Sequence, residues 1–234
     1  MAACSLVIET STPHASIARV GSDGSVDQRG FCSDRNHNAL LFEPLQELMA
    51  VDGKPSLILV GSGPGSYSGT RVGIAAAQGI AIAMGCPAVA VPSILAVPAA
   101  ANGARCLAIG DARRGSFWTA RIGDFRLLEE PSLCDAAELG QRIAQASADG
   151  LEVFSFEETT RFPLPDELLV HVRIEIPDAT RLWQAWCGAD EETCWKWSAE
   201  IPQPLYLKPP HITPAKRPWL VQPAIHEQPG AGSP

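Results

Sequence analysis

The sequence predicts an α/β protein. Short apolar runs with the pattern of buried strands alternate along the chain with longer segments whose apolar residues recur at helical spacing. The chain has 234 residues, of which 46% are hydrophobic and 19% are charged, and this balance is typical of a globular protein rather than a disordered one. Its length allows one large domain or two small ones with a buried core.

In the first half of the chain, predicted strands precede and follow a helix. CSLVIETST (residues 4–12) has the pattern of a buried strand, ASIARV (15–20) that of its hairpin partner, and VDQRGFCS (26–33) that of a weaker third strand. Residues 36–50 carry leucines at helical spacing, although Pro44 requires a kink or a late helix start. Then follow a strand (56–60), a helix of small residues (69–85), a strand (87–93) and an Ala-rich helix (near 94–101).

A second unit begins near Arg105. Residues 105–122 have the pattern of strand, turn and strand, and Asp135 is a plausible cap for a helix over 133–146. Strands over 151–156 and 167–176, a helix over 179–188 and an extended piece over 204–210 follow. We therefore expect a first α/β lobe over residues 1–103 and a second over 104–217. Residues 218–234 are dominated by Pro, Gly, Gln and Ser, which predicts a disordered tail.

Charge and cysteine content exclude several classes of protein. The net charge is −8 and the pI is about 5.1, so the chain alone is a poor candidate for holding nucleic-acid backbones. Its seven cysteines form no CxxC pair, which gives no support to a zinc ribbon or a thioredoxin-type site. The uncharged run 72–104 contains three prolines that divide it, so we expect no membrane segment. A cytoplasmic protein with reduced thiols is the preferred interpretation.

A glycine-rich segment, GSGPGSYSGTRVGIAAAQGIA (61–81), follows the strand over 56–60. It is not a Walker A loop, because no lysine lies between Lys54 and Lys196. From Gly63 it reads G-P-G-S-Y-S, without the last glycine of a dinucleotide fingerprint. Tyr67 stands where the nucleophile of an α/β-hydrolase would be. Three nucleotide-binding or catalytic interpretations are thus excluded.

The helix in this segment has a stripe of small residues at every fourth position. The stripe consists of Gly69, Gly73, Ala77, Ala81 and Gly85. A helix face with almost no side chains allows another backbone to approach closely. Two alternatives remain open from spacing alone: the stripe packs against the sheet of its own chain, or it packs against a helix of a partner chain.

Several motifs, in the same order, resemble those of the TsaB (YeaZ) family. SGPGSYSGTRVGIAAAQGIA (62–81) resembles the signature GPGSFTGLRIGLxxAKGLA, and LVIETSTPHASIARV (6–20) resembles the opening LAIDTSTxxxSVAL. NHNALLFEPLQELM (36–49) resembles the first long helix of the family. AIGDARRGSFWTARI (108–122) resembles the DARRGEVYxA hairpin, and PLYLKPP (204–210) resembles the terminal PxYLR. The similarity is strong over residues 5–120 and thin from there to about residue 205.

The resemblance implies the actin-like, sugar-kinase-like ATPase (ASKHA) fold with two related lobes, of which the second has diverged. It implies a non-catalytic partner subunit of a TsaD-like enzyme, required for N6-threonylcarbamoyladenosine formation at position 37 of tRNAs that read ANN codons. We expect a heterodimer with the TsaD-like subunit, and a TsaE-like ATPase as a further partner. When the chain is alone, a homodimer is expected. Contact with tRNA is expected only through the complex. The two matching helices form the dimer face in the family. This assigns the partner interface to His37, Leu41, Leu45, Gly69, Arg71, Gly73, Ala77 and Ala81.

We expect neither catalytic residues nor a metal site in this chain. The catalytic relative binds its metal through two histidines four residues apart, whereas His37 has Leu41 at that distance. The segment Glu9, Thr10, Ser11 and Thr12 stands where the fold has its first phosphate hairpin, with Glu9 where the family has Asp. These four residues are the weak candidates for ATP or ADP with Mg²⁺ at the interface of the complex. No cofactor is expected to be required by this chain.

Two alternative functions remain beside the partner role. The E-T-S-T segment leaves open an ATP-dependent phosphotransferase or ATPase of the same superfamily, and a peptidase is the weakest alternative because no nucleophile elbow or paired-His site is present. Arg113 and Arg114 either pair with an acid of a partner, contact a nucleotide phosphate or stay exposed at their turn. Trp183, Trp186, Trp195 and Trp197 are core residues or, for Trp195 and Trp197, interface anchors.

Overall fold

A computed structural model describes residues 4–33, 37–51 and 53–207, without the side chains of residues 37–39. The tail predicted over 218–234 lies outside the described residues, as do the last three residues of the PLYLKPP motif and the side chain of His37.

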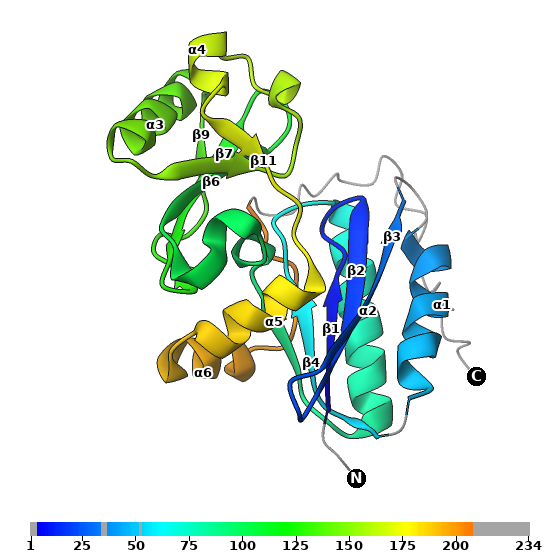
Figure 1. Cartoon of the computed structure of the whole chain (residues 1–234). Coiled ribbons are helices and arrows are strands. Elements are labelled where there is room, and N and C mark those ends of the chain that lie inside the picture. The colour runs from blue at the N-terminus through cyan, green and yellow to red at the C-terminus, as the bar shows by residue number, and fades with distance from the viewer. Residues whose placement is uncertain (1–3, 34–36, 52, 208–234) are drawn as a thin grey trace, which may run out of the picture.

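The first sheet has the strand order β3-β2-β1-β4-β5. Its β1 and β2 form an antiparallel hairpin, while β1, β4 and β5 run parallel to one another (Figure 1). The strands are β1 (Cys4–Glu9), β2 (His14–Gly21), β3 (Val26–Cys32), β4 (Pro55–Gly61) and β5 (Ala88–Val91). All five strands predicted for the first half of the chain are therefore confirmed.

Both faces of the central strands of the first sheet are buried, because different elements cover each face, whereas the edge strand β3 is largely exposed. Leu6 and Ile8 point to the face covered by α1 (His37–Met49) and α2 (Tyr67–Met84), where Leu41 and Ala77 also pack. Val7 points to the opposite face, toward the second sheet. This alternation follows from the two-residue period of a strand. The helix α1 begins at His37 and continues through Pro44, so the predicted helix is present without a late start.

The second sheet has the strand order β11-β10-β6-β7-β8, with β9 also paired to β7. Its strands are β6 (Cys106–Asp111), β7 (Phe117–Gly123), β8 (Arg126–Leu127), β9 (Ser132–Cys134), β10 (Glu152–Ser155) and β11 (Val172–Ile174). Again an antiparallel hairpin, β6 with β7, is followed by parallel strands, β10 and β11. The helix α3 (Ala136–Ala148) covers one face of this sheet and has the predicted cap, because the Asp135 carboxylate accepts a 2.9 Å hydrogen bond from Glu138 N.

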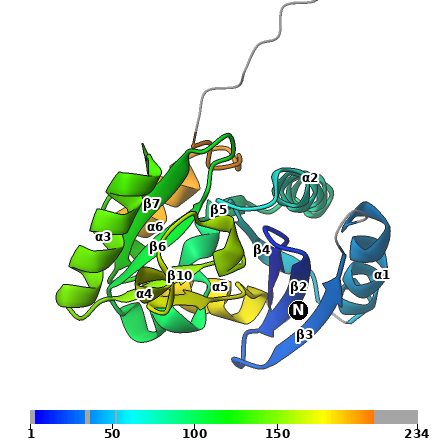
Figure 2. The same cartoon turned by 90° about the horizontal axis from the view of Figure 1, so that it is seen from above.

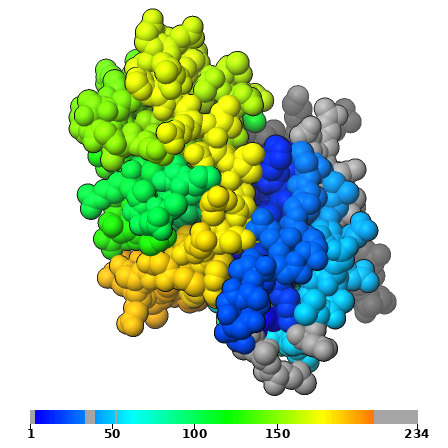
Figure 3. Space-filling model, in the orientation of Figure 1, coloured from blue at the N-terminus to red at the C-terminus, as the bar shows by residue number. Residues whose placement is uncertain are grey.

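The two sheets share one hydrophobic core. Val7 and Leu59 of the first sheet belong to the same buried cluster as Trp118 and Phe154 of the second. The helix α5 (Ala179–Gly188) packs against β1, and α6 (Glu191–Ala199) packs against β5, so the chain returns from the second sheet to the first (Figures 1 and 2). The start of α5 lies directly against the first sheet in Figure 3, where Ala179 N donates to Ser16 Oγ at 2.8 Å. The division at residue 103 stays a prediction.

Several local elements differ from the sequence predictions, and the short elements β8, β9 and η3 (Thr159–Arg161) were not predicted. The Ala-rich segment near 94–101 is not an α-helix but two 3₁₀ turns, η1 (Ser93–Leu95) and η2 (Pro98–Gly103), since Pro92 and Pro98 restrict the backbone at both starts. The strand predicted over 167–176 is a short helix, α4 (Asp166–Leu169), followed by β11. The proline and acidic residues that begin α4 favour a helix start. The helix α6 was not predicted.

The small-residue stripe of α2 faces the chain's own first sheet. A side chain at Gly69 would collide with the carbonyl oxygen of Thr10, and one at Gly73 would collide with Thr10 Oγ1. Ala77 and Ala81 are buried against the sheet in the same core cluster as Leu41 and Leu45 of α1. The assignment of these six buried residues to a partner interface is therefore corrected, because short side chains here allow α2 to approach β1. Gly85 is the exposed, left-handed C-cap of α2, with φ 70°.

We expect Gly69→Ala and Gly73→Ala each to destabilise the protein by about 1–3 kcal/mol, because a methyl group must be inserted into a filled contact. The melting temperature should fall by about 2–4 °C for each kcal/mol in a chain of this size. Gly79→Ala on the same helix is the matched control. A side chain there meets no atom within 4 Å, so this variant should be neutral or slightly more stable. Equal melting temperatures for all three variants would contradict the packing described above.

Candidate binding site at the junction of the two sheets

The segment after β1 is tied to the start of α2. Thr10 Oγ1 donates to Gly69 O at 2.9 Å, and Ser66 N donates to Ser11 O at 2.6 Å. Thr12 Oγ1 donates to His14 O at 3.0 Å. Glu9, Thr10, Ser11 and Thr12 are all buried. Thr10 and Ser11 thus hold the two elements together. Nucleotide binding by Glu9 to Thr12 stays a prediction.

Glu9 is a fully buried carboxyl group at the end of β1. Its Oε1 accepts a 2.7 Å hydrogen bond from Ser11 N, while its Oε2 has no hydrogen-bond partner among the described residues. Gly61 makes room for this carboxyl, since a side chain there would collide with Glu9 Oε2 and with Ser93 Oγ. Burial raises the pKa of Glu9, whereas the hydroxyl and N–H dipoles of Ser11 and the hydroxyl dipole of Ser93 lower it; the charge of Asp178 adds a smaller increase.

The loop between β4 and α2 is held in place by backbone and hydroxyl contacts. Gly63 N donates to Ser93 Oγ at 3.0 Å, and the peptide bond between Gly63 and Pro64 is cis. Ser66 caps α2, because its Oγ accepts a 3.2 Å hydrogen bond from Gly69 N. The signature segment therefore presents the N-terminal end of α2 at the surface, beside the junction of the two sheets.

The C-terminal described segment crosses this junction. Leu205 N donates to Ser62 O at 2.9 Å, and Gln78 Nε2 donates to Pro202 O at 2.9 Å. Arg71 donates to Tyr206 Oη at 2.9 Å, and its guanidinium lies 3.3 Å from the ring centroid of Tyr67. Arg71 thus holds the C-terminal segment against α2, and its predicted place at a partner interface stays a prediction.

The turn between β6 and β7 lies at the same junction, on the side of the second sheet. Arg113 (φ 68°), Arg114 (φ 59°) and Gly115 (φ 71°) all have left-handed backbone, and Ala112 N donates across the turn to Ser116 O at 2.9 Å. Arg113 pairs with Asp111 at 3.3 Å, and Asp111 N donates to the carboxylate of Glu157 at 2.6 Å. Burial raises the pKa of Glu157.

These elements enclose a hollow of about 680 Å³, here called the junction pocket. It lies between the start of α2, the β6–β7 turn and the C-terminal segment. Its lining residues are Ser62, Pro64, Gly65, Ser66, Tyr67, Thr70, Arg71, Ala112, Arg113, Arg114, Leu133, Pro204, Leu205, Tyr206 and Leu207. Three of them are arginines and none is acidic. A second hollow of about 650 Å³ on the other side of the C-terminal segment contains both signs of charge, among them Glu192 and Lys196.

The outer face of α2 is a second candidate surface. No charged residue occurs from Val72 to Met84. Ala75, Gly79 and Ile82 lie along one side of the helix and are exposed, and the side chain of Ile82 is 84% exposed. On the neighbouring helix α1, Leu40 and Phe42 are also exposed. The outer side of α2 is therefore uncharged and exposed, whereas α1 exposes Glu43 and Glu47 as well as Leu40 and Phe42.

The structure brings the predicted site residues together only in part. Of the segment Glu9 to Thr12, Thr10 meets Gly69 and Gly73 inside the protein, whereas Arg71, Arg113 and Arg114 meet in the junction pocket. Sequence reasoning missed Tyr206 as a partner of Arg71 in α2 and Leu205 as a partner of Ser62 in the β4–α2 loop, although both belong to the recognised PLYLKPP motif. Among the described residues, no three His, Cys, Asp or Glu side chains are arranged to hold a metal ion, and no helix has the length and apolarity to cross a membrane.

Comparison with known proteins identifies the family. The family model described as TsaD, tRNA N6-adenosine threonylcarbamoyltransferase, matches residues 32–165. The tRNA threonylcarbamoyladenosine biosynthesis protein TsaB of Escherichia coli (strain K12) is 32% identical over 123 residues, which are 49% of this chain and 53% of that protein. The chain belongs to the TsaD family of this model, and within it to the TsaB (YeaZ) group. The matched segment spans about half the length of the curated TsaB relative.

Solved structures agree in fold with this TsaB-group chain. YeaZ from Pseudomonas aeruginosa is similar with a TM-score of 0.65 at 22% identity, over 88% of this chain and 100% of that one. A Pseudomonas aeruginosa protein described as similar to the peptidase YEAZ gives a TM-score of 0.63 at 21% identity over the same shares. The α/β architecture with two sheets fits the ASKHA fold implied by the sequence resemblance.

We expect the free energy of unfolding of Glu9→Gln, relative to that of the unsubstituted chain, to increase as the pH rises. The folded pKa of Glu9 lies above its ordinary value of 4.5, so the folded state keeps a proton that the unfolded state releases at higher pH. Stability is therefore lost as the pH rises from the unfolded pKa to the folded pKa, by about 1.4 kcal/mol for every pH unit between them. Glutamine has no proton to release, but it can keep the bond from Ser11 N.

The measurement is chemical denaturation of both proteins at several values between about pH 4 and pH 8. The stability difference between Glu9→Gln and the unsubstituted chain should grow with pH. Parallel stability curves would show that Glu9 ionises equally in the folded and unfolded states. Other shifted groups, such as Glu157, are present in both proteins and cancel in the difference.

Proposed function

We propose that this protein is the non-catalytic partner subunit of a TsaD-like enzyme. In this role it supports N6-threonylcarbamoyladenosine formation at position 37 of tRNAs that read ANN codons. Membership of the TsaB group supports the proposal, as does the name of the curated relative, a tRNA threonylcarbamoyladenosine biosynthesis protein. A TsaE-like ATPase as a further component, and a homodimer of the free chain, stay predictions.

The observation that carries the proposal is the uncharged, exposed outer face of α2. Ala75, Gly79 and Ile82 lie along it, and Leu40 and Phe42 of the neighbouring helix α1 are exposed too. An exposed apolar surface is costly in water and marks an interaction site when it is large. The small residues at 75 and 79 allow a partner helix to approach closely, as ridges-into-grooves packing requires. The partner interface is therefore proposed on this side of α2, opposite the buried stripe.

We further propose that the two sheets are the cores of two related lobes. The parallel strands β4 and β5 follow the hairpin β1–β2 in the same arrangement in which β10 and β11 follow β6–β7. Glu9 ends β1, and Asp111 ends β6 at the matching place. The short α4 before β11, where the first lobe has the long α2 before β5, supports divergence of the second lobe. The lobes would comprise residues 1–103 and 104–217.

We expect Ile82→Glu to weaken association with the TsaD-like subunit of the same organism by at least about ten-fold, because a buried, unpaired carboxylate is costly at an interface. Association is measured by size-exclusion chromatography and calorimetry with both purified subunits. The matched control is Val170→Glu on the second sheet's side of the molecule, since the Val170 side chain is 75% exposed. This control should bind normally.

Both variants replace an exposed residue, so both should keep the melting temperature of the unsubstituted chain. If the folded Ile82→Glu variant binds as tightly as the control, the outer face of α2 is not the interface. If the unsubstituted chain does not bind the TsaD-like subunit at all, the partner function itself is wrong.

A further inference from the structure

The junction pocket has a charge opposite to that of the chain around it. Its lining includes Arg71, Arg113 and Arg114 and no acidic residue, while the whole chain carries a net charge of −8. The second hollow, beyond the C-terminal segment, is lined by three glutamates, one arginine and one lysine. Positive charge is therefore concentrated at one place, where three arginines from two elements line a single hollow. Clusters of arginines attract anions, and the negative charge of the rest of the chain repels anions elsewhere on the surface.

The three arginines keep donors for a ligand. Arg71 uses one nitrogen on Tyr67 O and another on Tyr206 Oη, which leaves further N–H groups on its five-donor guanidinium. Arg113 contacts Asp111 through one guanidinium nitrogen at 3.3 Å, and its side chain is 64% exposed. Arg114 lies at the tip of the turn and is also exposed. Guanidinium groups of this kind pair with phosphate oxygens through two parallel hydrogen bonds.

Aromatic and apolar side chains line the same hollow. The side chains of Tyr67 and Tyr206 are 74% and 53% exposed, and Leu133 lies beside them in the lining. Exposed aromatic rings next to arginines provide stacking surfaces for bases in proteins that bind single-stranded nucleic acid. A ligand that satisfies the whole lining therefore has a phosphate and a flat ring close together. A simple inorganic anion would leave the aromatic surfaces unused.

We propose that the junction pocket binds a phosphate and an adjacent base of an RNA strand. This inference rests on the proposed function, in which the modified molecule is a tRNA. Two sources share the chemistry of a phosphate beside a base, namely RNA and a free nucleotide. RNA is favoured because nucleoside di- and triphosphates bind with Mg²⁺, which proteins hold through carboxylates, and the lining contains none. The pocket thus gives this acidic subunit one RNA contact of its own.

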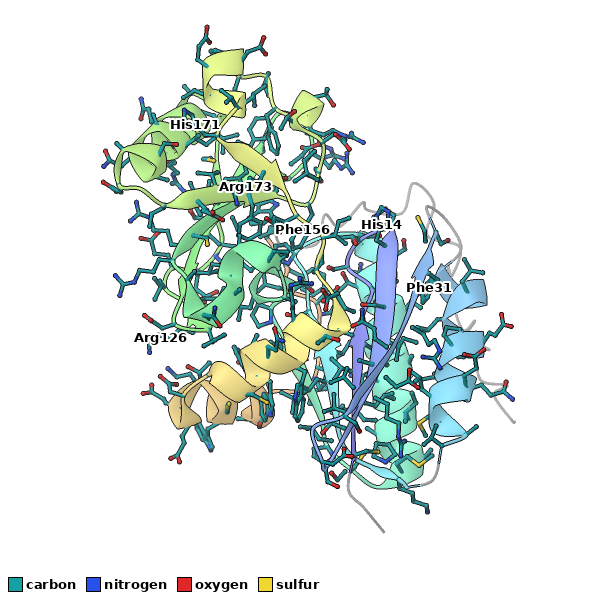
Figure 4. The ribbon with its side chains drawn as sticks, in the orientation of Figure 1. His14, Phe31, Arg126, Phe156, His171 and Arg173 are labelled. Carbon is teal, nitrogen blue, oxygen red and sulfur yellow. The ribbon has the colours of Figure 1, made fainter. Side chains whose placement is uncertain are left out.

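The test uses the full-length chain and a fluorescein-labelled RNA hairpin whose loop carries an ANN-reading anticodon. Binding is followed by fluorescence anisotropy over a series of salt concentrations. The variant is Arg113→Asn/Arg114→Asn, because asparagine tolerates the left-handed backbone found at both positions. The matched control is Arg105→Asn/Arg173→Asn, whose arginine side chains are 67% and 65% exposed and lie outside the pocket lining. Arg173 lies on β11 of the second sheet (Figure 4).

The pocket variant should bind RNA at least about ten-fold more weakly than the unsubstituted chain. The slope of log affinity against log salt should fall by about 0.7 for each phosphate that no longer pairs with an arginine. The control, which removes the same charge, should retain the affinity and the slope. Equal losses of affinity in both variants would mean that only net charge matters, and would overturn the proposal. Unchanged affinity in both variants would overturn it as well.

Two further measurements distinguish RNA binding from a nucleotide site and from a protein interface. Titration with ADP, with and without Mg²⁺, tests the free nucleotide. If the unsubstituted chain binds ADP saturably but does not bind RNA, and the pocket variant loses the ADP binding, the pocket is a nucleotide site instead. Association of the pocket variant with the TsaD-like subunit should be unchanged. If that association is lost while RNA binding persists, the arginines belong to a protein interface. Because RNA binding is measured on the chain alone, its failure is distinct from failure of the partner function.

Discussion

The close approach of α2 to the end of β1 is the contact on which the arrangement around the junction depends. It is possible only because Gly69 and Gly73 have no side chains where Thr10 O and Thr10 Oγ1 lie. This contact fixes the start of α2 beside the segment after β1, and Ser66 N and Ser11 O add a hydrogen bond there. The position of the signature loop therefore depends on these two glycines.

The other parts of α2 serve different contacts. Its inner side belongs to the core, its outer side is apolar and exposed, and its second turn carries Arg71. Arg71 joins this helix to Tyr206 of the C-terminal segment, which itself lies between the two hollows. The return of the chain through α5 and α6 brings that segment to the junction. A single helix thus connects the proposed partner surface, the junction pocket and the core.

Local patterns in the sequence determined most of the secondary structure. The strands of the first sheet, the hairpin β6–β7 and the helices α1, α2, α3 and α5 follow from hydrophobic period and from capping residues such as Asp135. The family resemblance was likewise readable, because its motifs are contiguous. Short elements were predicted less well, since α4 and the turns η1 and η2 contain too few residues for a period to be recognised. The candidate residues Glu9 to Thr12, Arg113 and Arg114 were also identified from their motifs.

The tertiary structure alone decided what these residues meet. Periodicity showed that one side of α2 has only small side chains. Either a sheet of the same chain or a helix of another chain can pack closely against such a side. Only the fold shows Thr10 against Gly69 and Gly73, and hence the opposite side of α2 as the exposed one. The junction pocket combines residues near positions 65, 113 and 206, and no local signal relates segments so distant in sequence. The sequence by itself determined the elements and the family, whereas their packing decided which side chains are buried and which share a site, because burial depends on all neighbours in space.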